Sequence, residues 1–150
     1  MKVELPIRLI LVDPPAGVDY GIQSGRGSNY EPLFVQQRKR RDVTFDFSLT
    51  VVDNRTDGQP NFQGPFAQGP AASRFVYVDV GTYAGQTNTQ WSRRMKVPLA
   101  GITWELIRKT VRKPGYKLSA KIPGTGRDGG PNCATVRLVG DWEIVKDRHD

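Results

Sequence analysis

The chain contains one cysteine and one histidine in 150 residues. A single cysteine excludes an internal disulfide, so nothing in the sequence points to an oxidising compartment. The histidine, His149, is next to the last residue, where chain ends commonly fray. Without an ordered histidine we expect no Ser-His-Asp triad, no Cys-His dyad around Cys133, no metal site and no cofactor. We interpret Cys133 as a small packed residue rather than a nucleophile.

Long apolar runs are also missing. The N-terminal stretch Met1–Arg8 carries Lys2, Glu4 and Arg8, which makes it a poor secretion signal and too charged to cross a membrane. The sequence therefore predicts a cytoplasmic protein with no membrane partner. No repeat or linker divides the chain, and its length suits one domain, so we predict a single domain over residues 1–150.

Basic residues outnumber acidic ones, with 22 Lys and Arg against 15 Asp and Glu, and the net charge is +7. A positive field favours anionic partners such as phosphorylated ligands or nucleic acid. The densest basic run is Arg38–Arg41, directly before a predicted strand. It is either part of a nucleic-acid surface or a solvated turn that helps solubility.

Glycine and proline are abundant, with 16 and 11 residues, which is typical of a chain with many turns and short strands. From Val43 to Val52 apolar and polar residues alternate, which predicts a strand whose buried face includes Phe45 and Phe47. Both faces of the segment Phe75–Tyr83 are largely apolar, so we expect this strand to be covered on both sides. Residues 53–73 carry turn residues throughout, and we interpret them as an ordered loop.

Residues 103–112 form the one segment with a clear helical pattern. Thr103 can serve as its N-cap, and Pro114 follows its end. We expect this helix to cover the second face of Phe75–Tyr83. The whole pattern predicts a mainly β fold: eight or nine antiparallel strands in a barrel or a two-sheet sandwich, with one covering α-helix.

A glycine-rich loop, Pro123–Cys133, contains the string Gly-x-Gly-x-x-Gly at residues 124–129. In a dinucleotide-binding fold that string opens a helix, whose N-terminus holds the pyrophosphate. Here Pro131 and a predicted strand follow, which argues against that function. Two interpretations stay open: a long hairpin turn, or an ordered loop that lines a ligand-binding cleft with the loop Gly64–Pro70.

In the second interpretation the loop contributes four candidate ligand-binding residues, which are Gly126, Arg127, Asp128 and Asn132. Arg127 is expected to face the ligand, because a guanidinium presents a fork of donors that fits carboxylate or phosphate. Backbone N–H groups in glycine turns can add to an anion-binding nest.

Asp79 stands in the middle of the predicted strand Phe75–Tyr83. A carboxylate on a mostly apolar face must be paired, hydrogen-bonded or protonated. We predict that Asp79 pairs with an arginine of the adjoining strand, either Arg93 or Arg94. A polar segment with aromatic residues between the two strands completes the list of candidate ligand-binding residues with Tyr83 and Trp91, in a pattern that suits ligand recognition or an ordinary wide hairpin.

Several strings together resemble the bacterial domain-of-unknown-function family 5990 (DUF5990). The likeness extends from about Leu5 to Val145, and the strings that carry it are Leu5–Arg8, Phe66–Pro70, Arg74–Gly81, Lys96–Leu99 and Ile122–Pro131. The resemblance implies a bacterial protein with no appended module. It implies no activity, ligand or site residue.

Three functions stay open on these observations. The first is a non-enzymatic binding module for a small polar or anionic ligand. The second is a basic protein associated with nucleic acid, which would use Arg38–Arg41 and the basic residues of the helix. The third is an enzyme of unfamiliar type, built on the carboxylates of Asp79 and Asp128 with neighbouring arginines.

Overall fold

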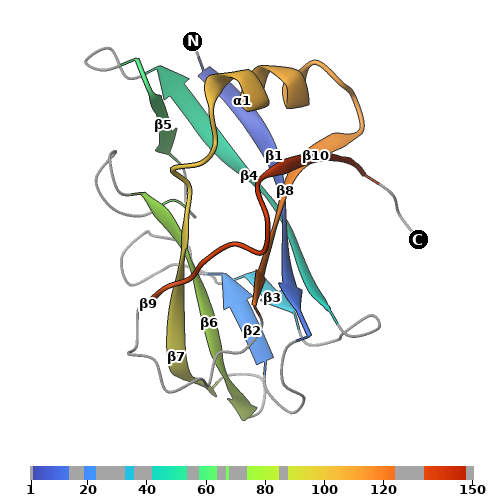
Figure 1. Cartoon of the computed structure of the whole chain (residues 1–150). Coiled ribbons are helices and arrows are strands. Elements are labelled where there is room, and N and C mark those ends of the chain that lie inside the picture. The colour runs from blue at the N-terminus through green and yellow to red at the C-terminus, as the bar shows by residue number, and fades with distance from the viewer. Residues whose placement is uncertain are drawn as a thin grey trace.

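The structure is a computed structural model that describes residues 2–13, 19–22, 33–35, 42–53, 58–63, 67, 74–84, 88–123 and 134–147. For residues 19, 33–35, 80–84, 88–93 and 134 it describes the backbone alone. These parts of the chain form two five-stranded sheets and one helix (Figure 1). The predicted mainly β fold with a single helix is therefore confirmed for the described residues.

The first sheet has the strand order β10-β8-β1-β4-β5. Its central strand β1 (Lys2–Val12) pairs antiparallel with β4 (Val43–Asp53) and parallel with β8 (Tyr116–Pro123). The edge strands are β5 (Pro60–Gln63) and β10 (Glu143–Lys146). Two expectations are corrected here: the sheet is mixed rather than antiparallel, and part of the predicted loop over residues 53–73 is a strand.

The second sheet has the order β3-β2-β6-β7-β9. It consists of β3 (Leu33–Val35), β2 (Asp19–Ile22), β6 (Phe75–Ala84), β7 (Asn88–Pro98) and β9 (Ala134–Thr135). The pairs β3-β2, β2-β6 and β6-β7 are antiparallel, whereas β9 joins β7 in parallel. The described residues thus hold ten strands rather than eight or nine, in two sheets that do not close into a barrel.

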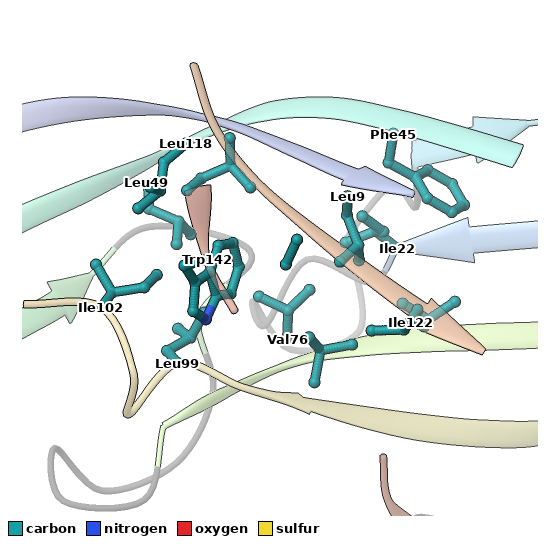
Figure 2. Close-up of a cluster of buried hydrophobic side chains, with 14 of the residues drawn as sticks. Leu9, Ile22, Phe45, Leu49, Val76, Leu99, Ile102, Leu118, Ile122 and Trp142 are labelled. Atoms are coloured by element: carbon teal, nitrogen blue, oxygen red, sulfur yellow. The ribbon is translucent and has the colours of Figure 1, made fainter. Parts of the chain in front are cut away.

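One hydrophobic core lies between the two sheets. Alternation along each strand turns one side inward, and both sheets contribute buried residues to a single cluster (Figure 2). Phe45 on β4 is 1% exposed, as predicted. Phe47 lies on the same inner side but is only partly buried, so that prediction holds for its face and is wrong for its degree of burial.

The helix α1 (Trp104–Val111) begins where the sequence predicts. Thr103 accepts a hydrogen bond from the backbone N–H of Leu106 through its hydroxyl, at 3.2 Å, which caps the helix. The helix packs on β1, β8 and β10 and lies near the start of β1 (Figure 1). The expected position over Phe75–Tyr83 is therefore wrong, because Ile107 is buried in the core cluster instead. This eight-residue helix, the one helix in the described part of the chain, is too short to cross a membrane.

Candidate functional site

The outer side of the β6–β7 pair carries aromatic and charged residues. The antiparallel register pairs Tyr77 with Lys96 and Asp79 with Arg94, one strand supplying each partner. The neighbouring positions Val76 and Val78 are buried in the core. Because side chains alternate along a strand, Tyr77 and Asp79 therefore stand on the side of this sheet that faces away from the core.

Asp79 and Arg94 form a two-point ion pair on this outer side. Arg94 donates from Nε to Asp79 Oδ1 at 2.7 Å and from Nη2 to Asp79 Oδ2 at 3.3 Å. The Asp79 side chain is 1% exposed and that of Arg94 is 31% exposed. The prediction that Asp79 pairs with an arginine of the adjoining strand is thus confirmed, with Arg94 as the partner.

The cations of β7 lie over the rings of β6. The guanidinium carbon of Arg94 is 4.6 Å from the ring centre of Tyr77, and Lys96 Nζ is 5.1 Å from that of Phe75. The two rings are themselves in edge contact, with centres 4.8 Å apart. Each cation thus leans one pair along the ladder from its register partner, which holds the long side chains against the sheet.

Lys96 differs from Arg94 in its charge balance. None of the ion pairs among the described residues includes Lys96, whereas Arg94 is neutralised by Asp79. Lys96 also lies next to β9, since its backbone C=O accepts a hydrogen bond from the N–H of Val136 at 2.9 Å. An uncompensated cation against an aromatic ring is a chemical feature that suits an anionic partner.

The glycine-rich loop connects the two sheets. Before it, Pro123 of β8 pairs with Val12 in the first sheet, and after it Ala134 of β9 pairs with Met95 in the second. The interpretation as a hairpin turn is therefore wrong, because the flanking strands do not pair with each other. The candidate residues of the loop lie outside the described residues, and they are Gly126, Arg127, Asp128 and Asn132, together with Cys133.

The loop re-enters the described structure beside the charged face. Ala134 follows directly after the loop, and its register partner Met95 follows directly after Arg94. The next pair along joins Thr135 to Lys96. The expected cleft between this loop and Gly64–Pro70 stays a prediction, because only Ala67 of that second loop is described.

The remaining candidates, Tyr83, Trp91 and Arg93, lie on the same two strands. The structure places Trp91 opposite Gly81 and Tyr83 opposite Thr89, and a bulge follows Val80. Most of the predicted polar loop is thus strand β7, which begins at Asn88. The side chains of these three candidates are outside the described part, so their convergence with Asp79 stays a prediction.

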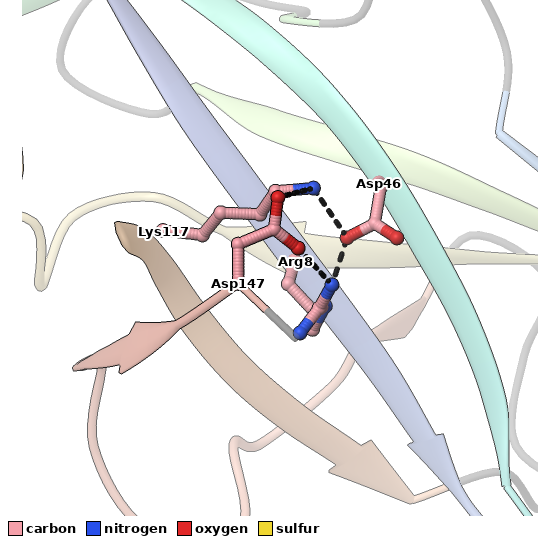
Figure 3. A network of polar contacts seen from close by, with 4 residues as sticks. All are labelled: Arg8, Asp46, Lys117 and Asp147. Atoms are coloured by element: carbon pink, nitrogen blue, oxygen red, sulfur yellow. Dashed lines mark hydrogen bonds and ion pairs between the residues drawn. The ribbon is translucent and has the colours of Figure 1, made fainter. Parts of the chain in front are cut away.

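A second ionic cluster, on the first sheet, was not foreseen from the sequence (Figure 3). Arg8 donates to Asp46 and to Asp147, both at 2.8 Å, and Lys117 Nζ lies 3.1 Å from Asp46 and 3.5 Å from Asp147. The hydrogen bond to Asp46 is the main cause that raises the pKa of Arg8 above its ordinary value. Only the register that sets Arg8 opposite Asp46 could have shown this cluster.

This second cluster has as many carboxylates as cations, so it ties strands together and offers no net charge to a ligand. Among the described residues, no group of three or more His, Cys, Asp or Glu side chains is placed to hold a metal ion. The unbalanced cation on the outer side of β6 and β7 is therefore the better candidate site. It is defined by Lys96, Phe75 and Tyr77, with Arg94 held in place by Asp79.

The fold and this site define a mainly β protein with a cationic, aromatic sheet face. The chain belongs to DUF5990, a family of unknown function, whose sequence model matches residues 5–145. The resemblance noted in the sequence is therefore confirmed. No curated protein and no solved structure matches the chain in the same comparisons.

Proposed function

We propose that this protein is a non-enzymatic binding module for a small anionic ligand, held on the outer side of β6 and β7. The observation that carries the proposal is Lys96, whose ammonium lies 5.1 Å from the ring centre of Phe75 and takes part in no ion pair among the described residues. A carboxylate or phosphate group would neutralise it, and the rings of Phe75 and Tyr77 would border the ligand.

Asp79 supports this arrangement indirectly. It fixes the guanidinium of Arg94 from both carboxylate oxygens, so the edge of the site does not change when a ligand arrives. The glycine-rich loop joins β9 beside Lys96, and the proposed module uses Gly126, Arg127, Asp128 and Asn132 as further ligand contacts. A loop tethered at both ends to rigid strands is suited to that role.

The setting proposed for the module follows from the fold and the family. We take residues 1–150 as one bacterial, cytoplasmic domain in which the two sheets face each other as a sandwich. The shared core of the two sheets and the family match over residues 5–145 support this view. The absence of a claimed catalytic residue is part of the proposal.

Isothermal titration calorimetry with inorganic phosphate and citrate tests the proposed site. Lys96→Met keeps a long apolar side chain beside Phe75 and removes the charge, and we expect affinity to fall about tenfold or more. Lys121→Met is the matched control, because Lys121 is exposed on β8 in the other sheet and loses the same unit of charge. Equal weakening in both variants would show a nonspecific charge effect and would contradict the proposal.

The nucleic-acid alternative has one observation in its favour. Arg108, Arg112 and Lys113 are exposed at the C-terminal end of α1, where cations also suit the helix dipole. The other basic run, Arg38–Arg41, lies outside the described residues. Fluorescence anisotropy with a single-stranded oligonucleotide decides this alternative: specific use of these cations requires affinity that falls steeply with salt and weakens in Arg108→Gln.

The enzymatic alternative gains no observation. Asp79 accepts hydrogen bonds from Arg94 through both oxygens and is shielded from solvent, which suits a structural role better than acid or base work. Asp128 lies outside the described residues.

A further inference from the structure

Three buried side-chain atoms in the described part of the chain have no hydrogen-bond partner: Asn61 Oδ1, Arg74 Nε and Trp142 Nε1. Native proteins leave few buried polar atoms unpaired, and each one asks for an explanation. Two of the three are donors, and both belong to residues that adjoin the same turn, Leu99–Gly101. Asn61 differs, because it offers an acceptor and pairs with Val52 on the far edge strand β5.

Arg74 directly precedes β6 and continues its ladder, since its C=O accepts a hydrogen bond from the N–H of Leu99 at 3.2 Å. Strand alternation puts Arg74 on the same side as Val76 and Val78, which face the core. Burial lowers the pKa of its guanidinium, and no neighbouring carboxylate opposes that effect. A charge in this position lacks the counter-ion that buried charges normally require.

Trp142 brings the second donor. Its side chain lies in the core near Leu49, Leu99 and Ile102 and is 6% exposed as a residue (Figure 2). Its nitrogen-bearing edge faces Gly101: a Cβ added at Gly101 would be 3.3 Å from Trp142 Cδ1 and 3.8 Å from Trp142 Nε1. Gly101 itself is exposed. Glycine at this position therefore leaves the space beside the indole N–H clear on the solvent side.

We propose that the Arg74 guanidinium and the Trp142 indole N–H form a binding site for a small oxyanion at the turn Leu99–Gly101. An oxyanion offers only acceptors, which both unpaired donors lack, and its charge balances that of Arg74. A carboxylate, sulfate or phosphate group has this chemistry. The site is separate from the one proposed at Lys96 and does not depend on it.

Thermal unfolding in sodium sulfate or sodium acetate, with sodium chloride at equal ionic strength as the reference, tests this site. A ligand that binds the folded protein raises its Tm by mass action. We expect sulfate or acetate to raise the Tm of the wild type and of Lys96→Met, and to leave Arg74→Met at its chloride value. In chloride alone, Arg74→Met should melt no lower than the wild type, because it removes an unpaired, desolvated charge.

Equal anion stabilisation of the wild type and Arg74→Met would overturn the proposal, as would no stabilisation of the wild type by either anion. The variant Lys96→Met separates the two sites. If it alone loses stabilisation, the oxyanions bind at the outer face and this proposal fails. If Arg74→Met alone loses it, this site stands whatever becomes of the one at Lys96.

A spectroscopic measurement on the wild type keeps the test decisive if Arg74→Met does not fold. The indole N–H resonance of Trp142, assigned by its loss in Trp142→Phe, should move during titration with sulfate. Gly101→Ala should weaken that titration about tenfold or more, because its methyl group occupies the approach to the indole edge. An unmoved Trp142 resonance at sulfate levels that stabilise the protein would overturn the proposal.

Discussion

Asp79 and Arg94 face each other directly across the β6–β7 ladder and are joined by two hydrogen bonds, 2.7 and 3.3 Å long. The carboxylate is almost completely buried, although it lies on the side of the sheet away from the core. The guanidinium also covers the ring of Tyr77. This one pair therefore sets the position of an arginine and an aromatic ring at the edge of the proposed site.

Breaking the Asp79–Arg94 pair should destabilise the protein strongly. Removing one partner of a buried pair leaves the other charge unmatched, which typically costs about 3–5 kcal/mol. Arg94→Met should cost more than Asp79→Asn, because it strands the more deeply buried charge. Urea unfolding of both single variants and the double variant measures their coupling. Additive losses would mean that the two residues do not act as a pair.

Phe45 and Phe47 offer a matched test of core packing on β4. Phe45 is 1% exposed, so Phe45→Ala should lower the free energy of unfolding by about 3–5 kcal/mol. Phe47 is only partly buried, so Phe47→Ala should cost clearly less. Denaturant unfolding of the two variants gives the comparison. A larger loss for Phe47→Ala would contradict the register that the structure assigns to β4.

The N-cap of α1 should contribute a modest, specific stabilisation. Thr103→Ala removes the hydroxyl that accepts from the Leu106 N–H, and we expect a loss of about 1 kcal/mol. Thr103→Ser keeps the hydroxyl and is the control, which should unfold close to the wild type. If serine and alanine at this position give the same loss, the capping hydrogen bond is not the source of the effect.

The ionic cluster on the first sheet should hold Asp147, next after β10, against the neighbouring strands. Arg8 contacts Asp46 and Asp147 at once, so Arg8→Met leaves Lys117 as the one cation of the cluster. We expect amide hydrogen exchange to accelerate in β10, including Val145, with little change in β7. Unchanged exchange in β10 would show that the cluster does not secure this edge of the sheet.

Local patterns in the sequence were enough for the strand around Phe45, the capped helix at Thr103 and the charge pairing of Asp79. Each of these depends on neighbours along the chain or on the need of one buried charge for a partner. The helix position was not predictable in this way, because an amphipathic face does not say which sheet it meets. The packing of Ile107 on the first sheet is a tertiary choice.

Parallel pairing was the largest gap. The parallel pair β1–β8 joins segments more than a hundred residues apart, and no local pattern specifies such a partner. The same is true of the cluster of Arg8 with Asp147 and of the unpaired donors of Arg74 and Trp142. These contacts depend on register and topology, so residues that look ordinary in the sequence become notable only in three dimensions.

Chemical-shift mapping of backbone amides during titration with phosphate or citrate tests the binding function most directly. The account predicts that the amides of Lys96, Thr135 and Val136 shift together with saturable dependence on the anion, and that Lys96→Met abolishes these shifts. A second, separate set at Leu99–Gly101 would report the other proposed site. Binding that leaves the β7 and β9 amides unmoved, or no saturable binding of either anion, would contradict the proposed function.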